Sequence, residues 1–187
     1  MFPLRLAECA SVCYISVSIF KDLIMAEKEN HNKTNARRLL ENASIPFRFY
    51  EYDVADGRID GRSIAEKIGE SPDQVFKTLV TQAPPGKEYF VFVVPASGEL
   101  DLKKAAKACG RKSIEMIPQK LLFPLTGYVH GGCSPIGMKK QFPTFIDETA
   151  ILYDYICVSG GRIGTNLGID PEALASFIGA ELVPLIR

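Results

Sequence analysis

Two glycine-rich stretches of the sequence have the composition of loops that hold a ligand through the backbone. HGGCSPIG, residues 130–137, contains three glycines and one proline in eight residues, and SGGRIG, residues 159–164, contains a second glycine pair. Each follows a segment with the pattern of a strand. Glycine lets backbone N–H groups come close to a ligand, as an oxyanion hole or a carboxylate cradle requires. A tight turn is the alternative for each loop, but loops at strand ends often carry function, and these two could converge on one site.

A lysine within an apolar run is the second feature that could do chemistry. Lys77 lies in the middle of QVFKTLV, residues 74–80, which has the length and composition of a buried strand. An ammonium group without a partner in a protein interior is strongly destabilising or loses its proton. Lys77 therefore either faces solvent on the polar side of the strand or has a function.

The first glycine loop also contains a cysteine and a histidine that could act as nucleophile and base. Cys133 and His130 are three residues apart. Such a pair needs a hydrogen bond of about 3 Å and a third group that orients the histidine, and no neighbouring residue supplies one. The five cysteines have no CxxC spacing, which argues against a zinc ribbon and a closed disulfide framework. We interpret them as reduced thiols of a cytosolic protein.

The charge of the chain limits where a nucleic acid could bind. Lysine and arginine total 22, as do aspartate and glutamate, so a polyanion would have to bind a local patch. One candidate patch has five positive charges within residues 103–112, and a second is the pair Lys139 and Lys140. Charged helix faces are more often only solvated. A local patch on a neutral protein predicts weak, salt-sensitive binding.

The N-terminal segment differs in composition from the rest of the chain. Residues 1–24 are apolar with one early arginine, so they resemble a weak signal peptide, but their apolar run is too short to indicate a membrane span. A polar stretch begins at Met25, as at a natural N-terminus. We expect residues 1–30 to be an extension outside the fold and residues 31–187 to form one domain. A targeting or packing role is the alternative.

The remaining sequence mixes helical and strand patterns irregularly. Residues 74–95 predict a β-hairpin, and Ser63 with Glu66 predicts a capping box for a short helix that Gly69 ends. Further helices are predicted over residues 34–43, 101–110 and 170–179. Short strands are predicted at PFRFYEY, TGYVH, PTFIDE, ILYDYICVS, GTNLGI and ELVPLIR. The pattern lacks the rhythm of a doubly wound sheet and predicts an α+β domain, with a mixed, strongly curved, barrel-like β-sheet flanked by helices.

Several motifs in one order carry a family resemblance. VFKTLV is followed by VPASGELDLKKAAKACG, TGYVHGGCSPIG, PTFIDE and VSGGRIG. In order and spacing, the chain from about Ala36 to its C-terminus resembles the YbaK family. YbaK proteins are trans-acting deacylases of mischarged tRNA and are similar to the editing domain inserted in bacterial prolyl-tRNA synthetases. The resemblance implies a YbaK-like aminoacyl-tRNA deacylase domain over residues 31–187 that uses no metal and no organic cofactor.

The resemblance also implies site residues by position. The family's lysine aligns with Lys77, and its G-x-x-x-P loop begins at Gly131, so these two are the expected catalytic residues. The expected substrate-binding residues are Tyr52, Thr78, Gly132, Ser134, Pro135, Ser159 and Gly160. Asn166 stands where many members have an acidic residue, which argues against a charged contact there. His130 and Cys133 are not part of the family pattern.

The function that the resemblance implies depends on the chemistry of the substrate. The expected reaction is hydrolysis of Cys-tRNA(Pro), in which the cysteine thiol attacks its own ester. Lys77 is expected either to hold the terminal phosphate or sugar or to donate to the developing oxyanion, which the N–H groups of Gly131 and Gly132 could also stabilise. Removal of alanine from tRNA(Pro) is the nearest alternative, and a tRNA-binding module without catalysis is an alternative of another class. We expect a cytoplasmic monomer that binds the 3′ end of mischarged tRNA, with prolyl-tRNA synthetase as the implied partner and no membrane association.

Overall fold

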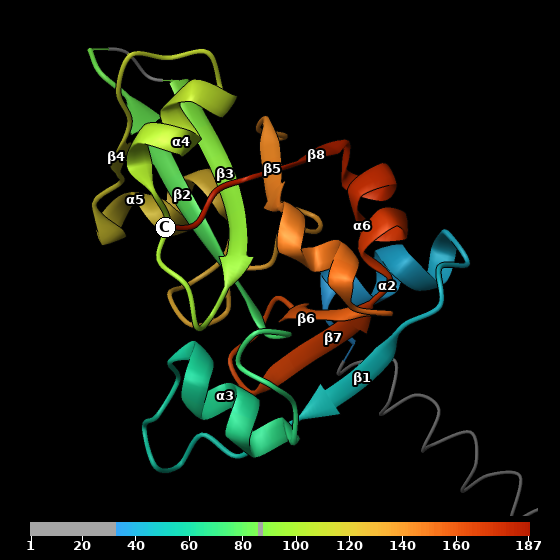
Figure 1. The fold of residues 1–187 in the computed structure, drawn as a ribbon. Coiled ribbons are helices and arrows are strands. Elements are labelled where there is room, and N and C mark those ends of the chain that lie inside the picture. The colour runs from blue at the N-terminus through green and yellow to red at the C-terminus, as the bar shows by residue number, and fades with distance from the viewer. Residues whose placement is uncertain (1–32, 86–87) are drawn as a thin grey trace, which may run out of the picture. The chain divides into compact units, whose positions relative to one another are not determined.

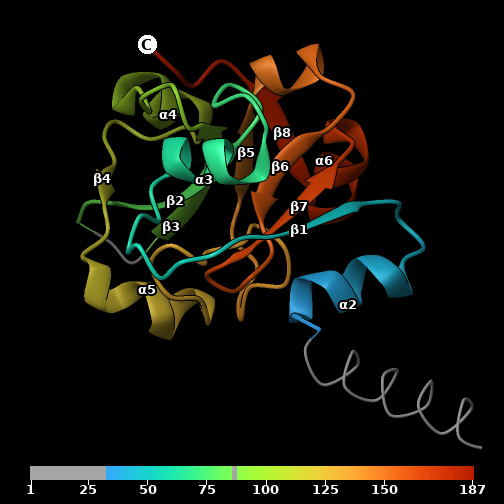
Figure 2. The same cartoon turned by 90° about the horizontal axis from the view of Figure 1, so that it is seen from below.

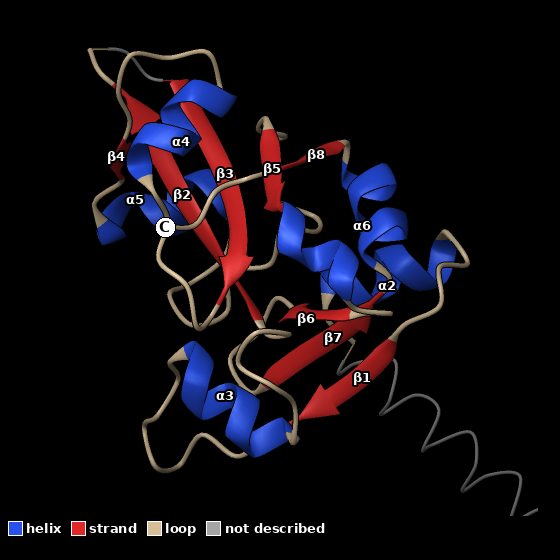
Figure 3. Cartoon of the chain, viewed as in Figure 1, coloured by secondary structure: helices blue, strands red, loops and turns tan. Residues whose placement is uncertain are grey.

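A five-stranded sheet forms the larger part of the fold (Figures 1 and 3). Its order is β4-β2-β3-β5-β8, and the predicted hairpin forms its centre, with β2 and β3 antiparallel. β5 and β8 extend the sheet in parallel, whereas β4 pairs antiparallel at the other edge. These strands are β2 (Phe76–Ala83), β3 (Glu88–Pro95), β4 (Glu115–Met116), β5 (Thr144–Asp147) and β8 (Ala180–Val183).

A second, three-stranded sheet lies at the end of β2 from which the hairpin starts (Figure 1). It is antiparallel and consists, in order, of β1 (Arg48–Glu51), β7 (Thr165–Ile169) and β6 (Ile156–Ser159). A backbone bridge between Val75 and Cys157 links the two sheets. The predicted α+β class with mixed strand pairing is confirmed, but the strands of the described residues form two linked sheets and do not close into a barrel.

The structure, a computed structural model, describes residues 33–85 and 88–187. Within it, residues 34–187 form one unit. The predicted extension of residues 1–30 lies outside the described residues. None of the helices in the described ranges has the length and apolar character that a membrane crossing needs.

Most helices begin at polar capping residues. Asp101 and Asp170 accept hydrogen bonds from backbone N–H groups at the starts of α4 and α6, as predicted. The cap of α3 differs from the prediction, because Asp60 accepts from the Ser63 N–H at 3.0 Å and the capping box of Ser63 and Glu66 does not form. The helices are α2 (Asn35–Asn42), α3 (Gly61–Ile68), α4 (Leu102–Ala108), α5 (Gln119–Thr126) and α6 (Pro171–Ile178), with a 3-10 helix, η1, at Glu148–Leu152.

Two segments differ from their predicted secondary structure. TGYVH, residues 126–130, is not a strand: Gly127, at φ 81°, ends the unpredicted helix α5, and the chain continues as a loop. The predicted strand ILYDYICVS is shorter, because its first residues belong to η1 and only residues 156–159 pair in the sheet. Both glycine-rich stretches are nevertheless loops, as predicted.

The largest hydrophobic core lies between the two sheets and helices α2 and α6 (Figure 2). Leu40 of α2, Ile146 of β5 and Leu174 of α6 have no exposed surface in it. Ile136, which is also fully buried, belongs to the first glycine loop. The core therefore holds one end of this loop in place.

The C-terminal tail packs on the loop between β3 and α4. The Asp147 carboxylate accepts hydrogen bonds from the N–H groups of Leu185 and Ile186, at 2.8 and 3.1 Å. Ile186 forms a backbone bridge with Leu100, and a Cβ atom placed on Gly98 would lie 3.1 Å from Ile186 Cγ2. The tail thus supports the loop that carries Gly98.

Candidate active site

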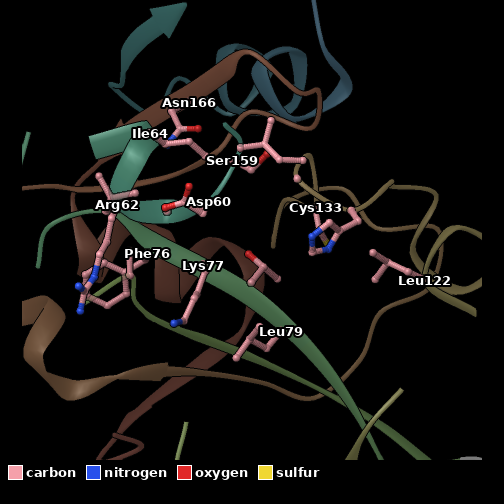
Figure 4. Close-up of a pocket in the computed structure, with 17 residues that line it drawn as sticks. Asp60, Arg62, Ile64, Phe76, Lys77, Leu79, Leu122, Cys133, Ser159 and Asn166 are labelled. Atoms are coloured by element: carbon pink, nitrogen blue, oxygen red, sulfur yellow. The ribbon is translucent and has the colours of Figure 1, made fainter. Parts of the chain in front are cut away.

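A cavity of about 400 Å³ lies where β2 approaches the smaller sheet (Figure 4). Its walls come from residues 59–62 and Ile64 around the start of α3, residues 75–79 in and before β2, Leu122, residues 130–131 and Cys133 of the first glycine loop, and Ser159 and Asn166 of β6 and β7. This volume is within the range of small-molecule sites, roughly 300–1,000 Å³. No group of three or more His, Cys, Asp or Glu side chains in the described residues is arranged to hold a metal ion.

Lys77 lines this cavity from β2, where it pairs with Val94 of β3 (Figure 4). Its Nζ atom donates a hydrogen bond to the Gly98 carbonyl oxygen at 2.7 Å. Burial lowers the pKa of the Lys77 ammonium, the Glu99 carboxylate raises it, and the Arg62 guanidinium lowers it further. An ammonium group has three donor hydrogens, and within the described ranges Gly98 uses one of them. Two donors are therefore available to a ligand.

The two glycine loops meet beside the cavity, so their predicted convergence is confirmed. A Cβ atom on Gly132 would lie 3.0 Å from the backbone nitrogen of Ile163 in the second loop. Gly131 has a φ of 80°, and a Cβ atom there would lie 2.7 Å from Ile59 Cδ1. The close contact between the loops therefore favours glycine at 132, and the left-handed backbone together with the contact to Ile59 favours glycine at 131.

The backbone N–H groups of the loops are not equally available. Gly132 donates to the Val129 carbonyl at 3.1 Å, and Gly160 donates to the Thr165 carbonyl at 2.9 Å. The N–H of Gly131 has no hydrogen-bond partner in the part of the chain that the structure describes. Of the two N–H groups expected to form an oxyanion hole, Gly132 is thus already bonded, and Gly131 is the available donor.

The seven expected substrate-binding residues divide into two groups. Thr78 and Ser159 line the cavity. Ser134 instead accepts a hydrogen bond from the Ile136 N–H at 3.2 Å and is fully buried within the loop. Pro135 lines a second cavity, of about 290 Å³. The members outside the wall of the first cavity are Tyr52, Gly132, Ser134, Pro135 and Gly160.

Comparison with known proteins assigns the family. Residues 62–177 match the aminoacyl-tRNA editing domain, and this range contains Lys77 and both glycine loops. The chain belongs to the aminoacyl-tRNA editing domain family. It is 43% identical over 161 residues to EbsC, an Enterococcus faecalis protein named as a candidate Cys-tRNA(Pro)/Cys-tRNA(Cys) deacylase. The matched region covers 86% of this chain and 98% of that protein. It is 22% identical over 127 residues to the uncharacterised Bacillus subtilis protein YwhH, over 68% of this chain and 78% of that protein.

The fold of this editing domain also matches solved structures. A crystal structure described as that of a candidate trans-editing enzyme for prolyl-tRNA synthetase superposes with a TM-score of 0.71, over 82% of this chain and 98% of that one, at 24% identity. The predicted YbaK resemblance is confirmed, and the chain is an enzyme of the aminoacyl-tRNA deacylase class.

The editing-domain cavity contains polar residues that the sequence analysis did not place in it. Asp60 and Arg62 lie at the start of α3, and Asn166 lies on β7 (Figure 4). The signal that could have placed Asp60 in the cavity wall was its position three residues before Ser63, which is the spacing of a helix cap. Asn166 is only 3% exposed and contributes a carboxamide side chain to the cavity wall.

Cys133 lines the editing-domain cavity, but its surroundings do not favour a nucleophile. Burial raises the pKa of the Cys133 thiol to about 12, so the thiol is protonated at neutral pH. His130 also lines the cavity, and no hydrogen bond joins the two side chains in the described ranges. The Cys–His alternative therefore lacks an activated pair.

Tyr52 lies outside the residues matched by the editing-domain model. Its side chain packs against the buried cluster that contains Ile64 and Ala65 of α3, and its N–H donates to the Gly164 carbonyl at 3.0 Å. Tyr52 thus connects α3 to the second glycine loop, behind the cavity wall.

Proposed function

We propose that the protein hydrolyses Cys-tRNA(Pro) and thereby removes cysteine that was attached to the wrong tRNA. The relative with 43% identity carries a name for this activity, and it is matched over 98% of its length. The observation that carries the proposal is the chemistry of the cavity. Lys77, Thr78 and Ser159 line it, whereas burial keeps the Cys133 thiol protonated. Such a cavity suits a substrate that supplies its own nucleophile.

The proposed nucleophile is the thiol of the cysteine substrate. Its sulfur attacks the ester carbonyl carbon, so a C–S bond forms as the C–O bond to the ribose breaks. The thiol proton goes to the ribose oxygen, which leaves as a hydroxyl group. Water then opens the resulting cyclic thioester and yields cysteine. The protein contributes by holding the reacting atoms in one geometry, which can supply about 7–11 kcal/mol of the barrier.

Lys77 is proposed to stabilise the negative charge that develops on the carbonyl oxygen. Its bond to the Gly98 oxygen holds the ammonium at the cavity wall, and two donor hydrogens remain for the substrate. The N–H of Gly131 is the proposed second donor. The Thr78 Oγ1 atom is buried without a partner among the described residues, so it and Ser159 are proposed to bind the polar groups beside the ester.

The other expected residues are proposed to position these groups. Gly132 and Gly160 fix the two loops, Ser134 and Pro135 anchor the first loop, and Tyr52 holds the second loop against α3. We propose that residues 31–187 are the catalytic domain. It is proposed to act in the cytoplasm as a monomer on the 3′ end of mischarged tRNA, with prolyl-tRNA synthetase as its partner.

The test is the deacylation rate of the purified protein on Cys-tRNA(Pro), Ala-tRNA(Pro) and Ser-tRNA(Pro). Cysteine should be released much faster than serine, because a hydroxyl group is a far weaker nucleophile than a thiol. Equal rates on cysteine and serine would exclude attack by the substrate thiol. A preference for alanine would assign the protein to the alanine-specific relatives, and tRNA binding without turnover on any of the three would make it a binding module.

A further inference from the structure

An exposed aromatic and basic surface lies on and around α5. Phe123 of α5 is 55% exposed, and Val129 in the loop that follows is 48% exposed. The Nζ atom of Lys139 lies 5.6 Å from the centre of the Phe123 ring. The Lys139 side chain passes over Gly127, whose Cβ position would lie 3.4 Å from Lys139 Cγ. We refer to Lys120, Phe123, Val129, Lys139 and Lys140 as the α5 surface.

The α5 surface is continuous with the cavity. Leu122 lines the cavity (Figure 4), and Phe123 follows it on the same helix. Successive helix residues point about 100° apart, so α5 presents Leu122 to the cavity and Phe123 to solvent. Val129 is followed directly by His130 and Gly131, which also line the cavity. A ligand that fills the cavity and extends past Leu122 therefore meets Phe123.

The charge of this region differs from that of the whole chain. Between Glu115 and Asp147 the sequence contains no acidic residue, although the chain as a whole is neutral. The same segment contains three lysines, all of which are exposed: Lys120, Lys139 and Lys140. The surface beside the cavity therefore complements a polyanion.

The other basic patch, within residues 103–112, is less suited to a ligand of the cavity. None of its residues lines the cavity. Arg111 is paired with Glu88 at 2.6 Å, and Lys104 donates to the Ile186 carbonyl at 2.6 Å. Two of its positive charges are therefore engaged within the protein.

We propose that the α5 surface binds the single-stranded 3′ end of the tRNA while the aminoacyl ester occupies the cavity, an inference that rests on the proposed function. A base stacks on the face of the Phe123 ring that Lys139 does not cover, and the three lysines contact the phosphates on either side. Stacking of this kind accepts any base, because every base has a π-face. The surface therefore supplies affinity for the strand without selecting its sequence.

The test compares Cys-tRNA(Pro) with cysteinyl-adenosine, an ester that fills the cavity but does not reach α5. Phe123→Ala should raise KM for Cys-tRNA(Pro) about tenfold, as expected for one lost base stack, and should leave kcat unchanged. Its KM for cysteinyl-adenosine should stay within about twofold of the wild-type value. Phe123→Trp should restore KM for the tRNA. Lys139→Ala and Lys140→Ala should each reduce the slope of log KM against log salt by about 0.7.

Phe49→Ala is the matched control. Phe49 is 36% exposed on β1, and the Arg37 guanidinium lies 4.8 Å from its ring, so it has the same aromatic and cationic character away from the cavity. Its KM for Cys-tRNA(Pro) should not change. An unchanged KM for Phe123→Ala, or an equal loss on both substrates, would overturn the inference. If Phe123→Ala kept its KM for Cys-tRNA(Pro) and lost only the rate increase produced by added prolyl-tRNA synthetase, the inference would also be overturned. The α5 surface would then be assigned to a protein partner.

A separate measurement distinguishes failure of this inference from failure of the proposed function. If the wild-type protein hydrolyses neither ester, the proposed function is wrong, and fluorescence anisotropy with a labelled single-stranded RNA ending in CCA then tests the α5 surface alone. Phe123→Ala should still weaken binding of this RNA about tenfold. Equal binding by the wild-type protein and the variant would refute the α5 surface as an RNA site.

Discussion

Replacing Lys77 by alanine tests the proposed chemistry most directly. The substitution removes the hydrogen bond of 2.7 Å from Nζ to the Gly98 oxygen, and a bond to a charged group stabilises a fold by about 1.5–3 kcal/mol. Burial of the ammonium, which lowers the pKa of Lys77, offsets part of that stabilisation. Gly98 is partly exposed, so its carbonyl can bond to water instead. We therefore expect the free energy of unfolding to change by at most about 1 kcal/mol, a Tm shift of about 2–4 °C.

The effect of Lys77→Ala on catalysis should be much larger than its effect on folding. Loss of one donor to a developing oxyanion lowers kcat by about 10²–10³, so the variant should keep at most about 1% of the wild-type kcat for Cys-tRNA(Pro). Single-turnover deacylation with excess enzyme measures this rate without a contribution from product release. Thermal unfolding of the same sample shows whether the variant is folded.

Lys107→Ala provides the control for this experiment. Lys107 is an exposed lysine in the last turn of α4, and it does not line the cavity. Its removal should leave kcat unchanged. A folded Lys77→Ala variant with a kcat within about threefold of the wild type would refute the role assigned to the lysine, as would an equal loss in Lys107→Ala.

Four further substitutions or deletions test other parts of the structure. Gly131→Ala places a side chain on a left-handed backbone, so it should lower the deacylation rate at least about tenfold and the free energy of unfolding in urea by about 1–2 kcal/mol. Gly57 has a φ of 69° and open space around it, so Gly57→Ala should lower stability alone. Cys133→Ala should keep most deacylase activity, and a complete loss would favour a nucleophilic thiol. Asp60→Ala should lower the free energy of unfolding by about 1 kcal/mol at pH 7. Hydrogen bonds from Ser63 lower the pKa of Asp60 in the folded protein. In urea titrations, the extra stability of the wild-type protein over the variant should therefore be present above the unfolded pKa and be lost as the pH falls through the folded pKa. Deletion of residues 1–24 should leave Tm and kcat unchanged, and a large fall in Tm would show that this segment belongs to the fold.

The parts of the site that the sequence predicted are those fixed by local pattern. Alternating and apolar residues in 74–95 have the period of two paired strands, so the hairpin and the position of Lys77 on it followed directly. The two glycine loops were recognisable because neighbouring glycines directly after a strand pattern favour a loop over continued strand pairing. Their contact through Gly132 and Ile163 is a long-range packing event, and no local pattern could show that the two loops approach so closely there.

The parts that the sequence did not predict depend on competing local signals. Asp60 and Ser63 are both good capping residues three positions apart, and the earlier one caps α3. Helix α5 was missed because Pro124 interrupts the helical pattern and removes a backbone donor. Missing α5 also concealed that Leu122 forms part of the cavity and that Phe123 is exposed next to it.

The packing of the C-terminal tail on the β3–α4 loop limits where a purification tag can be fused and which sequence changes the tail can accept. The carbonyl that holds Lys77 belongs to Gly98, and Ile186 supports that residue from behind. The C-terminal tail, which is distant from Lys77 in sequence, therefore helps to set the position of the Lys77 ammonium group through Gly98. A purification tag fused directly after Arg187, or sequence drift at the last three positions, would act on the catalytic rate without touching the substrate. A tag on the N-terminal side of Thr34 would leave this support intact.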